Sequence, residues 1–325
     1  MKCKLLPFLF SILFSFLVFL GAKKYFSRAN DKYFQVQKQS YRIFQPYIPD
    51  SISIFGEPVP IENIMVREKL EKEVLAVMYW HSRTILVLKK AYRFFPWIES
   101  ILKEENIPSD FKYLAIAESE LSTAVSPAGA TGYWQFLKST GKSYGLTINE
   151  YVDERNHILK STRAACKYLR HLKNSLGSYT LAAAAYNAGP QRISSAISMQ
   201  KNKNYFFLYF NEETSRYVYR IIAYKLIFES PTTYGFFLRN KDLYQPWQGK
   251  WIQIDTAINN LIEWANQFNL SYAELIYFNP WIKNYTLPKP DKNPYLIFIP
   301  SQKEYSFYIK ELKNPNQIAG DTITL

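Results

Sequence analysis

The feature that most constrains the fold is a short apolar run that ends in a carboxylate. Residues 111–117 hold a single charged side chain, and Ala115 and Ala117 favour a helix over a strand. Pro108 marks the expected first turn of this helix. Glu118 would then lie at the helix C-terminus, where the helix dipole and burial both oppose its ionisation. The sequence therefore predicts a carboxyl group with a raised pKa, which a general acid near neutral pH requires.

The segment after Glu118 is rich in turn-forming and aromatic residues. Ser126, Gly129 and Gly132 suit a backbone that turns tightly, and residues 133–136 read Tyr-Trp-Gln-Phe. Aromatic faces and an amide are groups that can bind sugars. The same residues also fit a solvated glutamate followed by a surface loop and core aromatics.

Helical periodicity dominates the middle of the chain. Hydrophobic residues recur at helical spacing through residues 61–229, and no strand pattern interrupts them. Helices are expected over 61–95, 96–105, 111–118, 139–146, 156–176, 179–187, 190–199 and 212–229. Residues 251–300 instead read strand, helix, helix, strand, with the helices at 260–268 and 272–278. The predicted fold class is mainly α, with an all-α domain followed by a small α+β unit.

The ends of the chain suggest where the protein works. Residues 5–22 are uninterruptedly apolar between lysines, which predicts a signal peptide or an uncleaved membrane anchor and an exported body. Cys3 and Cys166 are not expected to form a disulfide. The expected segments are the signal or anchor at 1–22, linkers at 23–60 and 231–250, the helical domain at 61–230, the α+β unit at 251–300 and a tail at 301–325.

The net charge of +13 suggests an anionic partner. The basic residues are scattered and no nucleic-acid-binding motif is present, so nucleic acid is not the expected partner. Membrane and cell-wall surfaces are both anionic and fit this charge.

Several motifs in order resemble those of lytic murein transglycosylases, of the goose-lysozyme-like superfamily and glycoside hydrolase family 23. The sequence AESELSTAVSPAGATGYWQF begins at Ala117 and is followed by LAAAAYNAG and then by ETSRYV. Residues 95–119 also resemble the membrane-bound type D branch of the family. The resemblance covers residues 61–229 and implies a lysozyme-like all-α catalytic domain.

The resemblance implies a role for each matching residue. Glu118 would be the single catalytic acid and base, and Tyr217 would hydrogen-bond to it. Tyr186 and Asn187 would contact the N-acetyl group of the sugar. Trp134 stands where many members have methionine, which suggests a changed wall of the cleft. The full set expected to bind or orient the substrate is Ser119, Ser126, Gly132, Trp134, Gln135, Tyr186, Asn187 and Tyr217.

The implied reaction cleaves the bond between N-acetylmuramic acid and N-acetylglucosamine in peptidoglycan and forms a 1,6-anhydro sugar, without a cofactor or metal. One carboxylate is enough for this reaction, whereas ordinary glycosidases need two. If Asp153 or Glu154 approached Glu118, hydrolysis of the lysozyme type would fit better. A peptidoglycan-binding protein without activity is a further alternative.

The unit at 251–300 weakly resembles a LysM module in its order of elements and in Asn279-Pro280 after its second helix. It lacks the usual Gly-Asp-Thr opening, and Asp255-Thr256 is the nearest match. A degenerate glycan binder and a structural appendage are equally compatible with this pattern.

Overall fold

The structure is a computed structural model that describes residues 43–291 and 293–301. The predictions for the apolar segment at 5–22, for Cys3 and for the tail beyond residue 301 lie outside these residues. Across the described ranges, none of the helices has both the length and the hydropathy that a membrane span requires.

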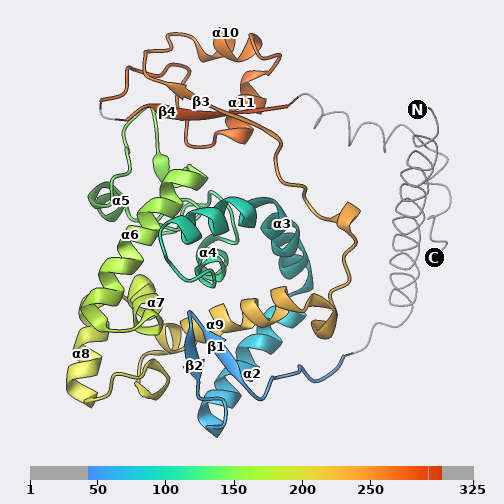
Figure 1. The fold of residues 1–325 in the computed structure, drawn as a ribbon, viewed down its shortest axis with the longest axis vertical. Coiled ribbons are helices and arrows are strands. Elements are labelled where there is room, and N and C mark those ends of the chain that lie inside the picture. Colours follow the sequence, from blue (N-terminus) through green and yellow to red (C-terminus); the bar gives the residue numbers. More distant parts are fainter. Residues whose placement is uncertain (1–42, 292, 302–325) are drawn as a thin grey trace, which may run out of the picture.

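Helices make up most of the described chain, and a small sheet unit follows them (Figure 1). The helices are α2 (Ile64–Tyr79), α3 (His81–Glu104), α4 (Phe111–Ser119), α5 (Lys138–Ser143), α6 (Ile158–Leu176), α7 (Tyr179–Ala188), α8 (Pro190–Gln200), α9 (Glu212–Glu229), α10 (Leu261–Asn266) and α11 (Tyr272–Phe278). Short 3-10 turns include η1 (Glu154–Asn156) and η2 (Tyr205–Phe207). The strands are β1 (Ile52–Ile54), β2 (Glu57–Val59), β3 (Gly249–Ile254) and β4 (Tyr295–Pro300). The predicted mainly α fold with a C-terminal α+β unit is confirmed.

Helix α4 lies at the centre of the helical domain, where α3 and α9 pack against it (Figure 1). Its residues 114–116 are completely buried. Helix α7 is equally central, and its four alanines at 182–185 have no exposed surface. Because alanine side chains are small, α6, α8 and α9 can all approach α7 closely.

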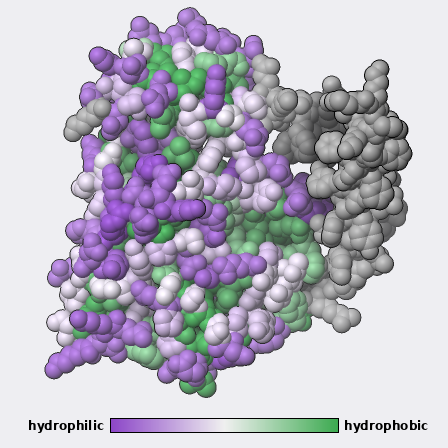
Figure 2. All heavy atoms as spheres, in the orientation of Figure 1, coloured by the Kyte–Doolittle hydropathy of each residue, from purple (hydrophilic) through white to green (hydrophobic). Residues whose placement is uncertain are grey.

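Helix α6 shows the amphipathic pattern expected from the sequence. Ala165, Leu169 and Leu172 are buried on its inner face, and Gly177 ends the helix in a left-handed conformation. Hydrophilic side chains cover the viewed surface over α6 (Figure 2). The helix therefore separates the core from solvent.

One predicted helix boundary is wrong. The sequence predicts a new helix at Pro96, but Pro96 lies inside α3, and the chain instead breaks at Trp80. Phe94 and Ile98 are both buried in the core, so packing on either side of Pro96 offsets the hydrogen bond that a proline cannot donate. At the break, the hydroxyl of Thr84 donates to the carbonyl of Val77 at 2.6 Å and satisfies a helix end.

The segment predicted as a linker before residue 61 contains a hairpin. Strands β1 and β2 pair antiparallel, with Ile52 opposite Val59, and Phe55 and Gly56 form the turn with positive φ. The ring of Phe55 stacks on Phe111 with 4.1 Å between centroids. Strands of three residues are too short to show a period, which is why the sequence did not reveal them.

The hairpin also contacts the start of α4. The helix begins at Phe111, as expected, whereas Pro108, which is expected in its first turn, lies three residues before it. The carboxylate of Asp110 accepts a hydrogen bond from the backbone N–H of Phe55 at 2.7 Å and pairs with Lys225 of α9 at 2.9 Å. One aspartate therefore ties the hairpin, α4 and α9 together.

We expect Phe55→Ala to lower the free energy of unfolding by about 3–5 kcal/mol, as for other buried phenylalanines. The variant loses the stack on Phe111 and leaves a cavity under the hairpin. Urea denaturation would measure the change. The exposed neighbour Ser53 provides the matched control, and Ser53→Ala should change stability by less than about 0.5 kcal/mol. Equal stability of the two variants would show that the hairpin is not part of the cooperative core.

Candidate active site

Glu118 occupies the last turn of α4, as the sequence predicts. The helix stops because Glu120 and Leu121 both adopt left-handed backbone angles, with φ of 53°. The backbone N–H of Glu120 donates to the carbonyl of Ile116 at 2.8 Å and closes the helix end. The chain therefore reverses its direction two residues after Glu118, and α4 ends there.

The carboxyl group of Glu118 accepts a hydrogen bond from the hydroxyl of Tyr217 of α9. Burial raises the pKa of Glu118 to about 7, and the hydrogen bond from Tyr217 opposes this rise. The charge of Glu213 raises the pKa further, and the charge of Arg220 lowers it. The raised pKa that the sequence predicts is present, and burial is its main cause.

Tyr186 of α7 stands near this pair. Its hydroxyl donates to the backbone carbonyl of Trp134 at 2.7 Å. Burial first, and then the charge of Glu118, raise its pKa well above the usual value for tyrosine. The pKa of Tyr217 is raised for the same two reasons. Three helices therefore bring a carboxyl group and two neutral phenols together.

The loop between α4 and α5, residues 120–137, forms another side of the site, and we call it the active-site loop. Gly132 has φ of 84°, and a Cβ there would lie 2.0 Å from the backbone oxygen of Arg155. Only glycine fits at this close approach. The side-chain amide of Gln135 donates to the carbonyls of Ala124 at 2.9 Å and Gly132 at 3.0 Å. Gly132 and Gln135 thus determine the shape of the loop.

The two predicted serines also act within the fold. The hydroxyl of Ser119 donates to the carbonyl of Tyr133 at 2.7 Å, which joins the end of α4 to the active-site loop. The hydroxyl of Ser126 accepts a hydrogen bond from the backbone N–H of Ala130 at 3.1 Å. Through these contacts, both serines stabilise the active-site loop.

The expectation that Trp134 forms a wall of the cleft is wrong for its side chain. The indole has no exposed surface, and its N–H donates to the hydroxyl of Thr162 of α6 at 2.9 Å. A completely buried ring cannot present a face to a substrate, so Trp134 anchors the loop to the core. Asn187 differs, because it is exposed at the end of α7, just before Gly189.

The two carboxylates that could have favoured hydrolysis are held elsewhere. Asp153 pairs through both oxygens with Arg155, at 2.9 and 2.6 Å. Glu154 pairs with Lys160 at 2.5 Å. Both acids are buried, and neither contributes to the shifted pKa of Glu118. Their buried ion pairs give them a structural role.

The sequence did not reveal the two charges that act on the acid, Glu213 and Arg220. A signal was nevertheless present, because Glu213 stands four residues before Tyr217 and Arg220 three residues after it. Residues at these spacings share one face of a helix. A search for charges around Tyr217 on its own helix would have found both.

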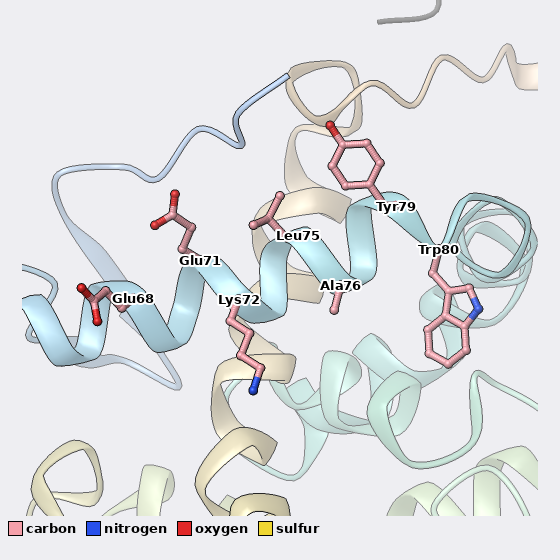
Figure 3. A pocket seen from close by; sticks show the side chains of 7 residues that line it. All are labelled: Glu68, Glu71, Lys72, Leu75, Ala76, Tyr79 and Trp80. Atoms are coloured by element: carbon pink, nitrogen blue, oxygen red, sulfur yellow. The ribbon is translucent and has the colours of Figure 1, made fainter. Parts of the chain in front are cut away.

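Within the described part of the chain, no three or more histidine, cysteine, aspartate or glutamate side chains gather in a way that could hold a metal ion. An open hollow of about 660 Å³ lies on α2, and Figure 3 shows Leu75 and Tyr79 pointing to one side of the helix and Lys72 and Trp80 to the other. Glu118 does not line this hollow. The acid site is therefore distinct from it.

Two family models match the chain. The Transglycosylase SLT domain matches residues 95–207, and the Soluble lytic transglycosylase C-terminal LysM-like domain matches residues 250–303. The first range includes Glu118 and Tyr186 but ends before Tyr217.

The chain is also similar to curated proteins. It is 28% identical over 270 residues to membrane-bound lytic murein transglycosylase D of Escherichia coli K12 and, equally, to the protein of that name from Escherichia coli O6:H1. Each match covers 81% of this chain and 57% of the relative, so the chain spans little more than half the length of these relatives. Residues 95–207 are therefore similar to a transglycosylase SLT domain, and residues 250–303 to a LysM-like C-terminal domain of soluble lytic transglycosylases.

Proposed function

We propose that this protein cleaves the glycan strands of peptidoglycan as a lytic transglycosylase, with Glu118 as the single acid and base. The observation that carries the proposal is the carboxyl group of Glu118, which has a pKa of about 7 and lies against Tyr217. A group with this pKa can give and take a proton near neutral pH. The matching SLT domain and the similarity to the murein transglycosylases support peptidoglycan as the substrate class.

In the first step, protonated Glu118 donates its proton to the oxygen between N-acetylmuramic acid and N-acetylglucosamine. The bond from this oxygen to C1 of the muramic sugar breaks, and the proton leaves on the N-acetylglucosamine hydroxyl. The N-acetyl group of the muramic sugar can stabilise the positive charge that develops at C1. Tyr217 stabilises the carboxylate of Glu118 that remains, because the Tyr217 hydroxyl donates a hydrogen bond to a Glu118 carboxylate oxygen.

In the second step, the Glu118 carboxylate takes the proton from the C6 hydroxyl of the muramic sugar. The C6 oxygen attacks C1 and closes the 1,6-anhydro ring, which returns the enzyme to its starting protonation state. No second carboxylate is needed, since the nucleophile belongs to the substrate. The ion pairs of Asp153 and Glu154 support this scheme, because both acids are occupied.

Hydrolysis is a second candidate reaction, with Glu213 as the second carboxylate. Glu213 is exposed on the first turn of α9, and its charge acts on Glu118. A second carboxylate near an acid could activate a water molecule. The product formed at the muramic sugar distinguishes the two reactions.

The location that fits this function is the cell envelope. The sequence predicts export through residues 5–22, followed either by cleavage or by retention as a membrane anchor. Either outcome would place the catalytic domain where peptidoglycan lies. N-terminal sequencing of the mature protein would distinguish a removed signal from a retained anchor.

We expect Glu118→Gln to lower the rate of peptidoglycan cleavage by about 10²–10⁴-fold, because an amide can neither donate nor accept the transferred proton. Mass spectrometry of digested sacculi would detect 1,6-anhydromuramic ends with the unchanged protein and few or none with the variant. Glu213→Gln is the matched control and should still form anhydro ends. Reducing ends in place of anhydro ends, lost in Glu213→Gln, would establish hydrolysis.

We expect Tyr217→Phe to move the alkaline limb of the pH–rate profile to higher pH. The hydroxyl of Tyr217 favours the ionised form of Glu118, so its removal raises the pKa of an acid that must begin protonated. The rate at the optimum should also fall, because the carboxyl group loses the contact that orients it. Tyr219→Phe, at a buried position on the same helix, should leave the profile unchanged. A shift of the limb to lower pH would contradict this role of Tyr217.

A further inference from the structure

The C-terminal unit is packed directly on the helical domain. The backbone N–H of Asp153 donates to the carbonyl of Trp281 at 2.8 Å, and Val152 forms a β-bridge with Ile282. The ring of His157 is stacked between Trp251 and Trp281, with centroids 5.3 and 5.5 Å away. One part of the contact surface on the helical domain is therefore the short segment of residues 151–157, which we call the bridging segment. Helix α3 forms another part, because Arg93 donates to the hydroxyl of Tyr277 and Trp97 packs against Trp251 and Phe298.

The bridging segment also holds the active-site loop. One nitrogen of the Arg155 guanidinium, Nη1, donates to the carbonyls of Gly129 and Phe136, each at 3.0 Å. The backbone oxygen of Arg155 is the atom against which Gly132 packs. A single arginine thus contacts the loop near its middle and near its end.

Asp153 connects these two sets of contacts. Its carboxylate holds the guanidinium of Arg155 through two hydrogen bonds, while its backbone N–H is bound to the C-terminal unit. Asp153 and Arg155 are both buried, with 7% of their surface exposed. A buried ion pair with additional hydrogen bonds has little freedom to move, because losing any contact leaves a charge unsatisfied.

We propose that the LysM-like unit braces the active-site loop through Asp153 and Arg155, and that Arg155 is a positioning residue of the active site. The unit then contributes to activity through the shape of the loop that carries Gln135 and contacts Ser119. The effect on catalysis rests on the proposed function, whereas the ordering of the loop does not.

The path of contacts is short and continuous. It runs from Trp281 to the backbone of Asp153, from the Asp153 carboxylate to Arg155, and from Arg155 to the loop carbonyls. A parallel contact links Lys160, which pairs with Glu154, to the carbonyl of Pro294 at 3.3 Å. The link from Trp281 is made by its backbone carbonyl, and its buried indole also stacks on His157 of the bridging segment. Removing the indole should therefore displace this segment and disturb the loop.

Hydrogen exchange tests the brace without reference to activity. Amides of the loop, such as those of Ser126 and Thr131, are hydrogen-bonded within the loop and should exchange slowly. In Trp281→Ala, we expect exchange in peptides from residues 120–137 to become at least about tenfold faster, while α7 and α9 keep their protection. Trp281→Phe provides a milder variant if the alanine variant does not fold.

Ile262→Ala is the matched control, because Ile262 lies in the same unit but is exposed on α10. It should leave exchange in the loop unchanged. Arg155→Lys should speed exchange in the loop as Trp281→Ala does, because an ammonium group does not reproduce the bonds of the guanidinium. Faster exchange within the C-terminal unit of either Trp281 variant, with the loop still protected, would overturn the proposal.

Kinetics then separates positioning from general destabilisation. Trp281→Ala and Arg155→Lys should each raise KM more than they lower kcat, because the loop contains residues expected to bind the substrate, such as Gln135, and does not contain the acid. If both act on the loop by one path, the double variant should lose little more kcat/KM than either single variant. Additive losses would contradict the brace, whereas absence of cleavage by the unchanged protein would count against the proposed function alone.

Discussion

The hydrogen bond between Tyr217 and Glu118 is the interaction on which the site depends. It joins α9 to α4 across 99 residues of sequence, and its donor, Tyr217, is buried in the core. Burial makes the acid hold its proton, and the tyrosine hydroxyl makes the proton easier to release. Because both effects require α4 to be packed against α9, the pKa of Glu118 depends on the packing of the core.

The parts of the structure that follow local rules could be predicted from the sequence. The bounds of α9 and α11, the end of α6 at Gly177 and the position of Glu118 on the last turn of α4 agree with the expectations. Helical periodicity and glycine at helix ends act over a few residues, so the local sequence contains them. The raised pKa of Glu118 followed from its apolar helix for the same reason.

The parts that depend on tertiary contacts could not be predicted. Pro96 remains inside α3 because residues on both sides of it enter one core, and no local rule contains that information. Trp134 stands beside the predicted cleft residues in the sequence, but its ring enters the core towards α6. Its neighbour Gln135 turns back on the loop instead. Adjacent residues thus have different roles, which a motif alone does not reveal.

The matched SLT range does not contain the whole site. It ends at residue 207, whereas Tyr217, Glu213 and Arg220 all lie on α9 beyond it. Helix α9 is held in place by the ion pair between Lys225 and Asp110. Asp110 also accepts a hydrogen bond from Phe55 of the hairpin, which precedes the matched range. The segments on both sides of the matched domain therefore set the environment of its acid. Proteins that share the SLT domain but differ in these flanking segments can differ in the pKa of their acid, even where the residues around Glu118 are the same.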